Sequence, residues 1–261
     1  MIVPNIAVQL GRIGDILNIL PACKHLGIGH MLINPQFDFV LKGQSYVRGV
    51  HWAGDMENLR LAVEFAHTIS PDVRVPQLFG RIQPDGLPPR TRDSFVIDQW
   101  DRIKPSFGDM FGRLPLEFDQ RDFERELKLL TELGLADIDR DVLLVNLFSN
   151  SSPVAADYAD EILAHLRTKY ADWHVVDLGN VRAEAYCDLL AVYECATGII
   201  TADTATLHLC RACPNLPTFH FVRHDKDCTY VREFEATQDY HERGMGKIDA
   251  FIKEMENGPK Y

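Results

Sequence analysis

Hydrophobic residues in the second half of the chain fall into short runs separated by polar turns and amphipathic stretches. Residues 142–148 form an apolar run of strand length, which is typical of a strand buried on both faces. The polar loop 149–152 follows at once, and Pro153 then suits the first turn of a helix that extends to about Tyr170. We therefore expect a strand, a polar turn and a helix in direct succession.

The same alternation continues toward the C-terminus. It predicts strands at residues 173–178, 198–202 and 216–222, and helices at 184–195 and from about Ala205. Strands that alternate with helices at this spacing form a parallel sheet through right-handed crossovers. The second half is therefore predicted to be a Rossmann-like lobe.

The first half repeats this pattern less regularly. A strand at residues 6–10 is followed by a glycine turn and by a helix at 15–26. Further strands are predicted at 30–33, 47–52 and 94–98, helices at 56–67 and 122–133, and loops over most of 73–92 and 105–119. The predicted fold class is α/β with two Rossmann-like lobes, each a mostly parallel sheet flanked by helices.

Three parts follow from this pattern. Residues 1–137 are expected to form the N-terminal lobe and residues 138–244 the C-terminal lobe, joined by a linker at 135–141. Residues 245–261 are expected to hold a terminal helix that braces the lobes by crossing back to the first.

Composition places the chain among ordinary globular proteins. It has 261 residues, 46% of them hydrophobic, and a net charge of −11. No apolar run approaches the length of a membrane span, and no secretory signal is recognisable at Met1. The six scattered cysteines indicate reduced thiols, so we expect a cytoplasmic protein. The negative charge disfavours bulk nucleic-acid binding but leaves room for a local basic groove.

The first turn with unusual chemistry is formed by Gly11, Arg12, Gly14 and Asp15, between the first strand and the first helix. Its glycines let the backbone approach a ligand, and the helix amides that follow attract negative charge. Asp15 has two interpretations. It is either an acidic helix cap or a carboxylate that acts as a general base on a hydroxyl group.

The second turn follows the strand at 198–202. Its candidate ligand groups for an anion are the amides and hydroxyls around Thr204, Ala205 and Thr206 and the imidazole of His208. The carboxylate of Asp203 would repel a phosphate, so we expect it to fix loop amides or to orient a ribose or sugar hydroxyl. Amides at a helix N-terminus bind diphosphates, and His208 lies one turn after Thr204 on the same side. The alternative for His208 is a histidine packed against the sheet.

A third turn, residues 149–152, also joins a strand to a helix. The hydroxyls of Ser149 and Ser151 are candidates for the same donor site, or for capping the helix that follows. His208, Cys210, Cys213 and Cys228 are of the residue types that bind metals, but no second paired-ligand motif completes a tetrahedral site. We therefore predict no metal and no cofactor.

Two segments resemble the heptosyltransferase-like glycosyltransferases of family 9. Residues 14–22 (GDILNILPA) are similar to the family's N-terminal signature. Residues 189–196 (LLAVYECA) and 199–212 (IITADTATLHLCRA) are similar to its second signature. The resemblance implies a GT-B fold, with the acceptor on the first lobe and a nucleoside-diphosphate sugar on the second. It implies that Asp15 is the catalytic base, that Asp203, Thr204 and His208 bind the diphosphate, and that transfer inverts the anomeric centre without a metal.

The chain also departs from the family pattern. Ala205 stands where the family has glycine, Thr206 replaces a proline, and the 149–152 loop has no lysine. The predicted function is therefore transfer of a sugar from a nucleoside-diphosphate donor to a hydroxyl acceptor on a glycan, a glycolipid or a modified base. The alternatives are a nucleotide-sugar-binding homologue without catalysis, and a transferase that acts on a modified DNA base.

Overall fold

The computed structural model describes residues 2–54, 58–76, 95–149, 154–222 and 236–257. These residues divide into two compact units. The first contains the described residues up to Arg121 and the short stretch Glu184–Cys187, and the second contains the described remainder from Asp122 onward. The domain limits expected at residues 137 and 244 remain predictions.

The described part of the first unit contains a four-stranded parallel sheet in the order β3-β2-β1-β4. Its strands are β1 (Asn5–Val8), β2 (His30–Ile33), β3 (Arg48–His51) and β4 (Asp72–Arg74). The first three were predicted, whereas β4 lies at the start of a segment interpreted mainly as loop. The central strand β1 is buried, and Ile6 and Val8 pack with α2 (Leu59–Ile69) in one apolar core.

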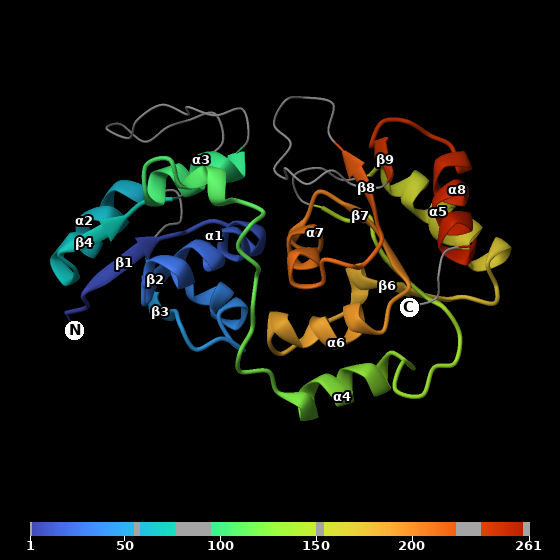
Figure 1. Ribbon diagram of the computed structural model, residues 1–261, viewed down its shortest axis with the longest axis horizontal. Coiled ribbons are helices and arrows are strands. Elements are labelled where there is room, and N and C mark those ends of the chain that lie inside the picture. Colours follow the sequence, from blue (N-terminus) through green and yellow to red (C-terminus); the bar gives the residue numbers. More distant parts are fainter. Residues whose placement is uncertain (1, 55–57, 77–94, 150–153, 223–235, 258–261) are drawn as a thin grey trace. The chain divides into compact units, whose positions relative to one another are not determined.

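Helix α1 (Ile13–Leu26) begins directly after β1 and is buried along most of its length. It ends at Gly27, whose φ of 66° is the left-handed conformation that glycine adopts without strain. Helix α3 (Phe95–Ile103) packs beside α1 (Figure 1). The short helices η1 (Pro35–Val40) and η2 (Phe107–Met110) complete this unit.

The strand expected at residues 94–98 is wrong, because the chain from Phe95 onward is the helix α3. Its apolar start is too short to distinguish the two structures by periodicity. Trp100 and Ile103 are buried and lie three residues apart, which is the spacing of a helix face. Packing against α1 therefore determines the structure of this segment.

The described part of the second unit contains a five-stranded parallel sheet in the order β6-β5-β7-β8-β9. Its strands are β5 (Val142–Asn146), β6 (His174–Asp177), β7 (Gly198–Ala202), β8 (Thr218–Val222) and β9 (Ala236–Asp239). All but β9 were predicted. The parallel order means that the turns after β5, β6 and β7 share one edge of the sheet, where open α/β sheets bind ligands.

Helices cover both faces of this sheet, as Figure 1 shows. They are α4 (Phe123–Glu132), α5 (Ala156–Lys169), α6 (Leu189–Glu194), α7 (Ala205–Leu209) and α8 (Gly246–Asn257), with short turns η3 (Leu178–Asn180) and η5 (Cys210–Ala212). A further 3₁₀ turn, η4 (Tyr186–Asp188), begins in the stretch that belongs to the first unit and leads into α6. The helix predicted at 184–195 is therefore shorter and begins with a 3₁₀ turn.

Two polar contacts fix helices of this unit to each other. Arg125 of α4 forms two hydrogen bonds of 3.0 Å with the buried carboxylate of Asp188, just before α6. Asp249 of α8 accepts hydrogen bonds from His165 of α5 and from Tyr170, both of 2.8 Å. The apolar face of α8 packs into the core of the second unit through Ile248, Phe251 and Ile252. Ile200 and Phe219 of the sheet belong to the same core.

Candidate functional site

The turn after β1 holds Asp15 in a defined position. The backbone amide of Arg12 donates a hydrogen bond of 3.0 Å to Asp15 Oδ2, which is the acidic half of a capping box. Gln9, buried at the end of β1, accepts a hydrogen bond from the Gly11 amide at 3.1 Å. The same side chain donates to the backbone carbonyl of Asp15 at 3.4 Å.

Gly11 leaves the space that the Asp15 side chain occupies. A Cβ atom at residue 11 would lie 2.6 Å from Asp15 Oδ2 and 2.8 Å from Asp15 Cβ. Both distances are shorter than real contacts, so any larger residue here would displace the carboxylate. Glycine is needed at position 11 because of the Asp15 side chain. The other glycine of the motif, Gly14, lies within the first turn of α1.

The structure shows the first interpretation of Asp15, the helix cap, and leaves the second, the general base, as a prediction. The carboxylate caps α1, yet the residue is only partly buried. Its second oxygen, Oδ1, accepts a hydrogen bond of 3.2 Å from the side-chain amide of Gln99 on α3. Sequence reasoning missed Gln99 because its segment was interpreted as a strand ending at Asp98. Capping occupies part of the carboxylate and leaves it the exposure that a base acting on a ligand requires.

The turn after β7 is organised around Thr204 and Thr206. Thr204 is the N-cap of α7, and its hydroxyl accepts a hydrogen bond of 3.1 Å from the Thr206 amide. Helix α7 has five residues, so its aligned peptide dipoles sum to little. A phosphate here would be bound chiefly by individual amides near Thr204 and Ala205, both partly exposed, in competition with the internal bond.

Three of the predicted donor residues are brought together at this edge. The buried Ser149 hydroxyl, after β5, donates to the backbone carbonyl of Asp203 at 3.2 Å, so it joins two turns. Thr206 accepts a hydrogen bond from Asn146, the last residue of β5. Its carbonyl accepts another, of 3.0 Å, from the buried Tyr193 hydroxyl. Asn146 was not predicted as a site residue, although a polar residue that ends an apolar strand can be recognised in the sequence. Ser151 lies outside the described residues.

His208 is buried rather than presented to solvent, with 6% of its surface exposed. Burial, the nearby charge of Arg211 and the neighbouring His220 lower the pKa of His208 to about 3. Burial also lowers the pKa of His220, on β8, to about 4. Both imidazoles are therefore neutral at pH 7, and His208 can serve a ligand as a hydrogen-bonding group but not as a cation.

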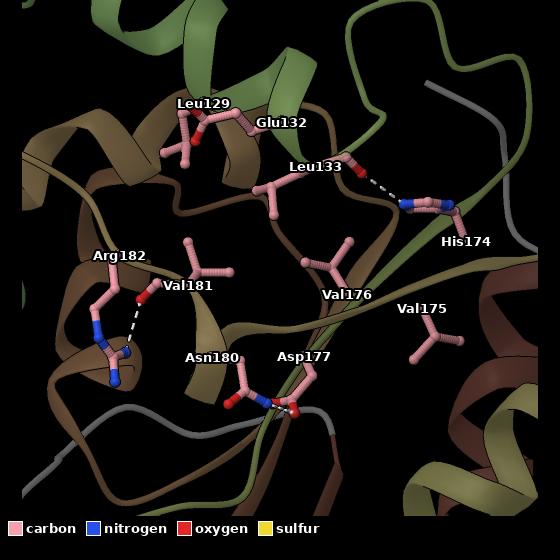
Figure 2. A pocket seen from close by; sticks show the side chains of 10 residues that line it. All are labelled: Leu129, Glu132, Leu133, His174, Val175, Val176, Asp177, Asn180, Val181 and Arg182. Atoms are coloured by element: carbon pink, nitrogen blue, oxygen red, sulfur yellow. Dashed lines mark hydrogen bonds between the residues drawn. The ribbon is translucent and has the colours of Figure 1, made fainter.

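A pocket of about 530 Å³ lies along β6, on the side covered by α4 (Figure 2). Leu129 of α4, the C-cap residue Leu133 and Val176 of β6 give it an apolar wall, while Asp177 ends the strand and Asn180 lies in the turn that follows. Asp177 accepts hydrogen bonds from the Gly179 amide at 3.0 Å and from the Asn180 side chain at 2.6 Å. None of these pocket residues was predicted from the sequence to belong to a site.

Phe148 connects the pocket's end of the sheet with the turn after β5. Its side chain is 68% exposed although it continues the apolar run of the strand. An ideal Cβ on Gly179 would lie 3.9 Å from Phe148 Cβ, so the turns after β5 and β6 are in contact. An exposed aromatic ring at this edge is suited to pack against a planar ligand group.

Among the residues that the structure describes, no group of three or more His, Cys, Asp or Glu side chains is arranged to hold a metal ion, and Cys228 falls outside them. Within the same residues, none of the helices combines the length and the hydropathy needed to cross a bilayer.

Two parallel, helix-covered sheets in one chain agree with the two-lobed, GT-B-like α/β fold that the motifs predict. Comparison with known structures bears this out. The chain is similar to the glycosyl transferase family 9 protein from Veillonella parvula DSM 2008, with a TM-score of 0.59, 11% identity, and coverage of 97% of this chain and 88% of that one.

It is likewise similar to E. coli heptosyltransferase WaaC with ADP, with a TM-score of 0.54, 12% identity and coverage of 97% and 100%. The chain is also similar to E. coli ADP-heptose lps heptosyltransferase II, with a TM-score of 0.54, 12% identity, and coverage of 98% of this chain and 100% of that one. No family model and no curated protein sequence matches the chain. At this identity the likeness establishes the fold that the chain shares with these proteins.

Proposed function

We propose that this chain is a glycosyltransferase that transfers a sugar from a nucleoside-diphosphate donor to a hydroxyl acceptor. The observation that carries the proposal is the partly exposed carboxylate of Asp15, fixed by two donated hydrogen bonds at the end of β1. The family 9 fold supports the same activity. The first unit is assigned to the acceptor and the second to the donor.

The proposed reaction is a single displacement. The acceptor hydroxyl attacks the anomeric carbon of the donor, and a new carbon–oxygen bond forms as the bond to the diphosphate breaks. The hydroxyl proton passes to the Asp15 carboxylate, and the electron pair of the broken bond leaves with the nucleoside diphosphate. Attack from the face opposite the leaving group inverts the configuration of the sugar. We propose that no metal or other cofactor is required.

The donor diphosphate is assigned to the turn formed by Asp203, Thr204, Ala205 and Thr206. Amides near Thr204 would donate to phosphate oxygens, and the neutral His208 would contribute a hydrogen bond. The guanidinium of Arg211, whose charge acts on His208, is the positive charge that the sequence analysis lacked in this region. These groups would stabilise the charge that develops on the leaving diphosphate.

The nucleoside is assigned to the end of β6. Strand order places β6 two positions from β7, or about 10 Å at the usual strand spacing. A donor whose diphosphate binds after β7 would extend across the turn after β5, past Phe148, toward Asp177 and Asn180 in the pocket. Phe148 would then pack against the nucleobase or the ribose.

A second candidate function is nucleotide-sugar binding without transfer. Ala205 adds a methyl group where the family has glycine, and the Thr204 hydroxyl is already engaged with the Thr206 amide. Both features weaken the case for tight binding of a diphosphate in a reactive orientation. Under this alternative, Asp15 would serve only as the cap of α1.

Incubation with a panel of nucleoside-diphosphate sugars and hydroxyl acceptors tests the proposal. ADP sugars and lipopolysaccharide-type glycans come first, because the similar E. coli proteins are named for ADP and ADP-heptose. Release of the nucleoside diphosphate together with a glycosylated acceptor supports transfer. Saturable nucleotide binding without transfer to any acceptor favours the second candidate.

A further inference from the structure

Gln99 contacts the proposed catalytic base from a distant part of the sequence. Its side chain, on α3, is fully buried, and its Nε2 atom donates a hydrogen bond of 3.2 Å to Asp15 Oδ1. The Arg12 amide binds the other oxygen, Oδ2, at 3.0 Å. The two carboxylate oxygens are thus held by two donors from different segments, which determines the orientation of the carboxylate plane.

The position of Gln99 is itself fixed by its neighbours on α3. Trp100 is buried, donates a hydrogen bond of 2.8 Å to the Asn18 carbonyl of α1 and stacks on Phe107. The buried Asp98 accepts a hydrogen bond of 3.3 Å from Arg102. Because groups on both sides of Gln99 anchor α3, the amide cannot move without displacing this packing.

A buried glutamine is a costly choice for packing alone. Burying an amide is unfavourable unless its polar atoms are hydrogen-bonded, and Gln99 Oε1 has no hydrogen-bond partner within the described part of the chain. An apolar side chain of similar length would fill the same space at lower cost. The presence of a buried amide here is consistent with a role for its donor atom, Nε2, toward Asp15.

We propose that Gln99 is a positioning residue that holds the Asp15 carboxylate in the orientation needed to accept the proton of the acceptor hydroxyl. This inference rests on the proposed transferase function. A neutral amide is suited to the task, because it fixes the carboxylate by hydrogen bonding. A lysine or arginine would hold it equally well but would reduce its basicity through a full positive charge.

The main test is Gln99→Met, which removes the donor at similar length and volume. We expect kcat for transfer to fall by about 10- to 100-fold, the cost typical of a misoriented catalytic group, while KM for the donor changes by less than about twofold. Gln99→Glu should lower kcat further, because it brings a second carboxylate against Asp15 Oδ1. Gln44→Met is the matched control, since Gln44 is also buried in the first unit but donates to the carbonyls of Leu41 and Val47. It should lower thermal stability without lowering kcat at a temperature where it is folded.

A spectroscopic measurement tests the contact without relying on activity. The side-chain amide signal of ¹⁵N-labelled Gln99 is assigned by its loss in Gln99→Met, and we expect it to shift in Asp15→Ala. An unshifted signal, or a folded Gln99→Met protein with kcat within twofold of the wild type, overturns the proposal. If the wild-type protein transfers no sugar to any acceptor, the proposed function fails as well. A signal that still responds to Asp15→Ala then identifies the contact as structural only.

Discussion

Gly11 and Asp15 are in such close contact that the first residue must lack a side chain: a Cβ atom at Gly11 would lie 2.6 Å from Asp15 Oδ2. The contact connects a turn glycine directly to the proposed base. The glycine at position 11 is therefore required by the neighbouring Asp15 carboxylate, whether or not a ligand also approaches the backbone there.

Gly11→Ala should therefore misplace the Asp15 carboxylate. We expect transfer to fall by about 10- to 100-fold while the donor Kd is unchanged, because the substitution lies in the unit that we propose binds the acceptor. Steady-state kinetics and calorimetry with nucleoside diphosphates measure the two effects. Gly29→Ala is the control, because its Cβ would meet nothing closer than Asn5 Oδ1 at 3.9 Å. Equal kinetics for the two variants would refute the role given to Gly11.

Ala205 offers a test of the donor turn. Ala205→Gly removes the methyl group that distinguishes this turn from the family pattern, so we expect donor affinity to increase by about 3- to 10-fold, or roughly 1 kcal/mol. Isothermal calorimetry gives the affinity. Ala156→Gly at the exposed start of α5 reports the general cost of glycine in a helix. If donor binding is unchanged or weaker in Ala205→Gly while the control is unaffected, the assignment of the diphosphate to this turn is wrong.

Phe148 tests the proposed path of the nucleoside. If its ring packs against the base, Phe148→Ala should cost about 1–3 kcal/mol of nucleotide binding, which raises Kd by about 5- to 100-fold. Phe123→Ala is a matched control, because Phe123 is also exposed and lies in the same unit, on α4. A Kd that is the same in both variants would place the nucleoside elsewhere.

The two buried histidines predict how stability depends on pH. In the folded state the pKa of His208 is lowered to about 3 and that of His220 to about 4, from an ordinary value of 6.5. Below pH 6.5 the unfolded chain binds protons that the folded chain does not, so the free energy of unfolding should decrease as pH falls from 7 to 5. Carboxylates titrate mainly below this window.

Urea unfolding at pH 7, 6 and 5, followed separately in wild type and His220→Leu, measures this dependence. The slope against pH should be smaller in the variant, whatever its absolute stability. An identical slope would show that His220 takes up its proton as readily in the folded protein as in the unfolded chain.

Much of the fold could be predicted from the sequence because its strands are short apolar runs followed by turn residues. Strands β1, β5 and β7 and helix α4 follow their patterns closely. The segment that became α3 could not be assigned, because its first residues are apolar in a row and its helical face is defined by packing against α1. The strand β9 has no apolar run, since its sequence is Ala-Thr-Gln-Asp.

The parts of the candidate site that lie within one contiguous motif could be predicted from the sequence. Asp15 and the turn from Asp203 to His208 lie in contiguous motifs, so the sequence predicts their local setting. Gln99 meets Asp15 only through the tertiary structure, and the neutral state of His208 depends on its burial beside His220 and Arg211. Such properties arise from contacts between distant segments and have no local signature.

The most direct test of the account is the effect of Asp15→Ala on transfer and on donor binding in the same preparation. We expect the substitution to abolish sugar transfer, with a loss of at least about 100-fold, while the Kd for the nucleoside diphosphate stays within twofold of the wild type. Thermal unfolding should show only the modest loss expected for a helix cap, about 1 kcal/mol. Near-normal transfer by a folded Asp15→Ala protein would contradict the central claim that this carboxylate is the catalytic base.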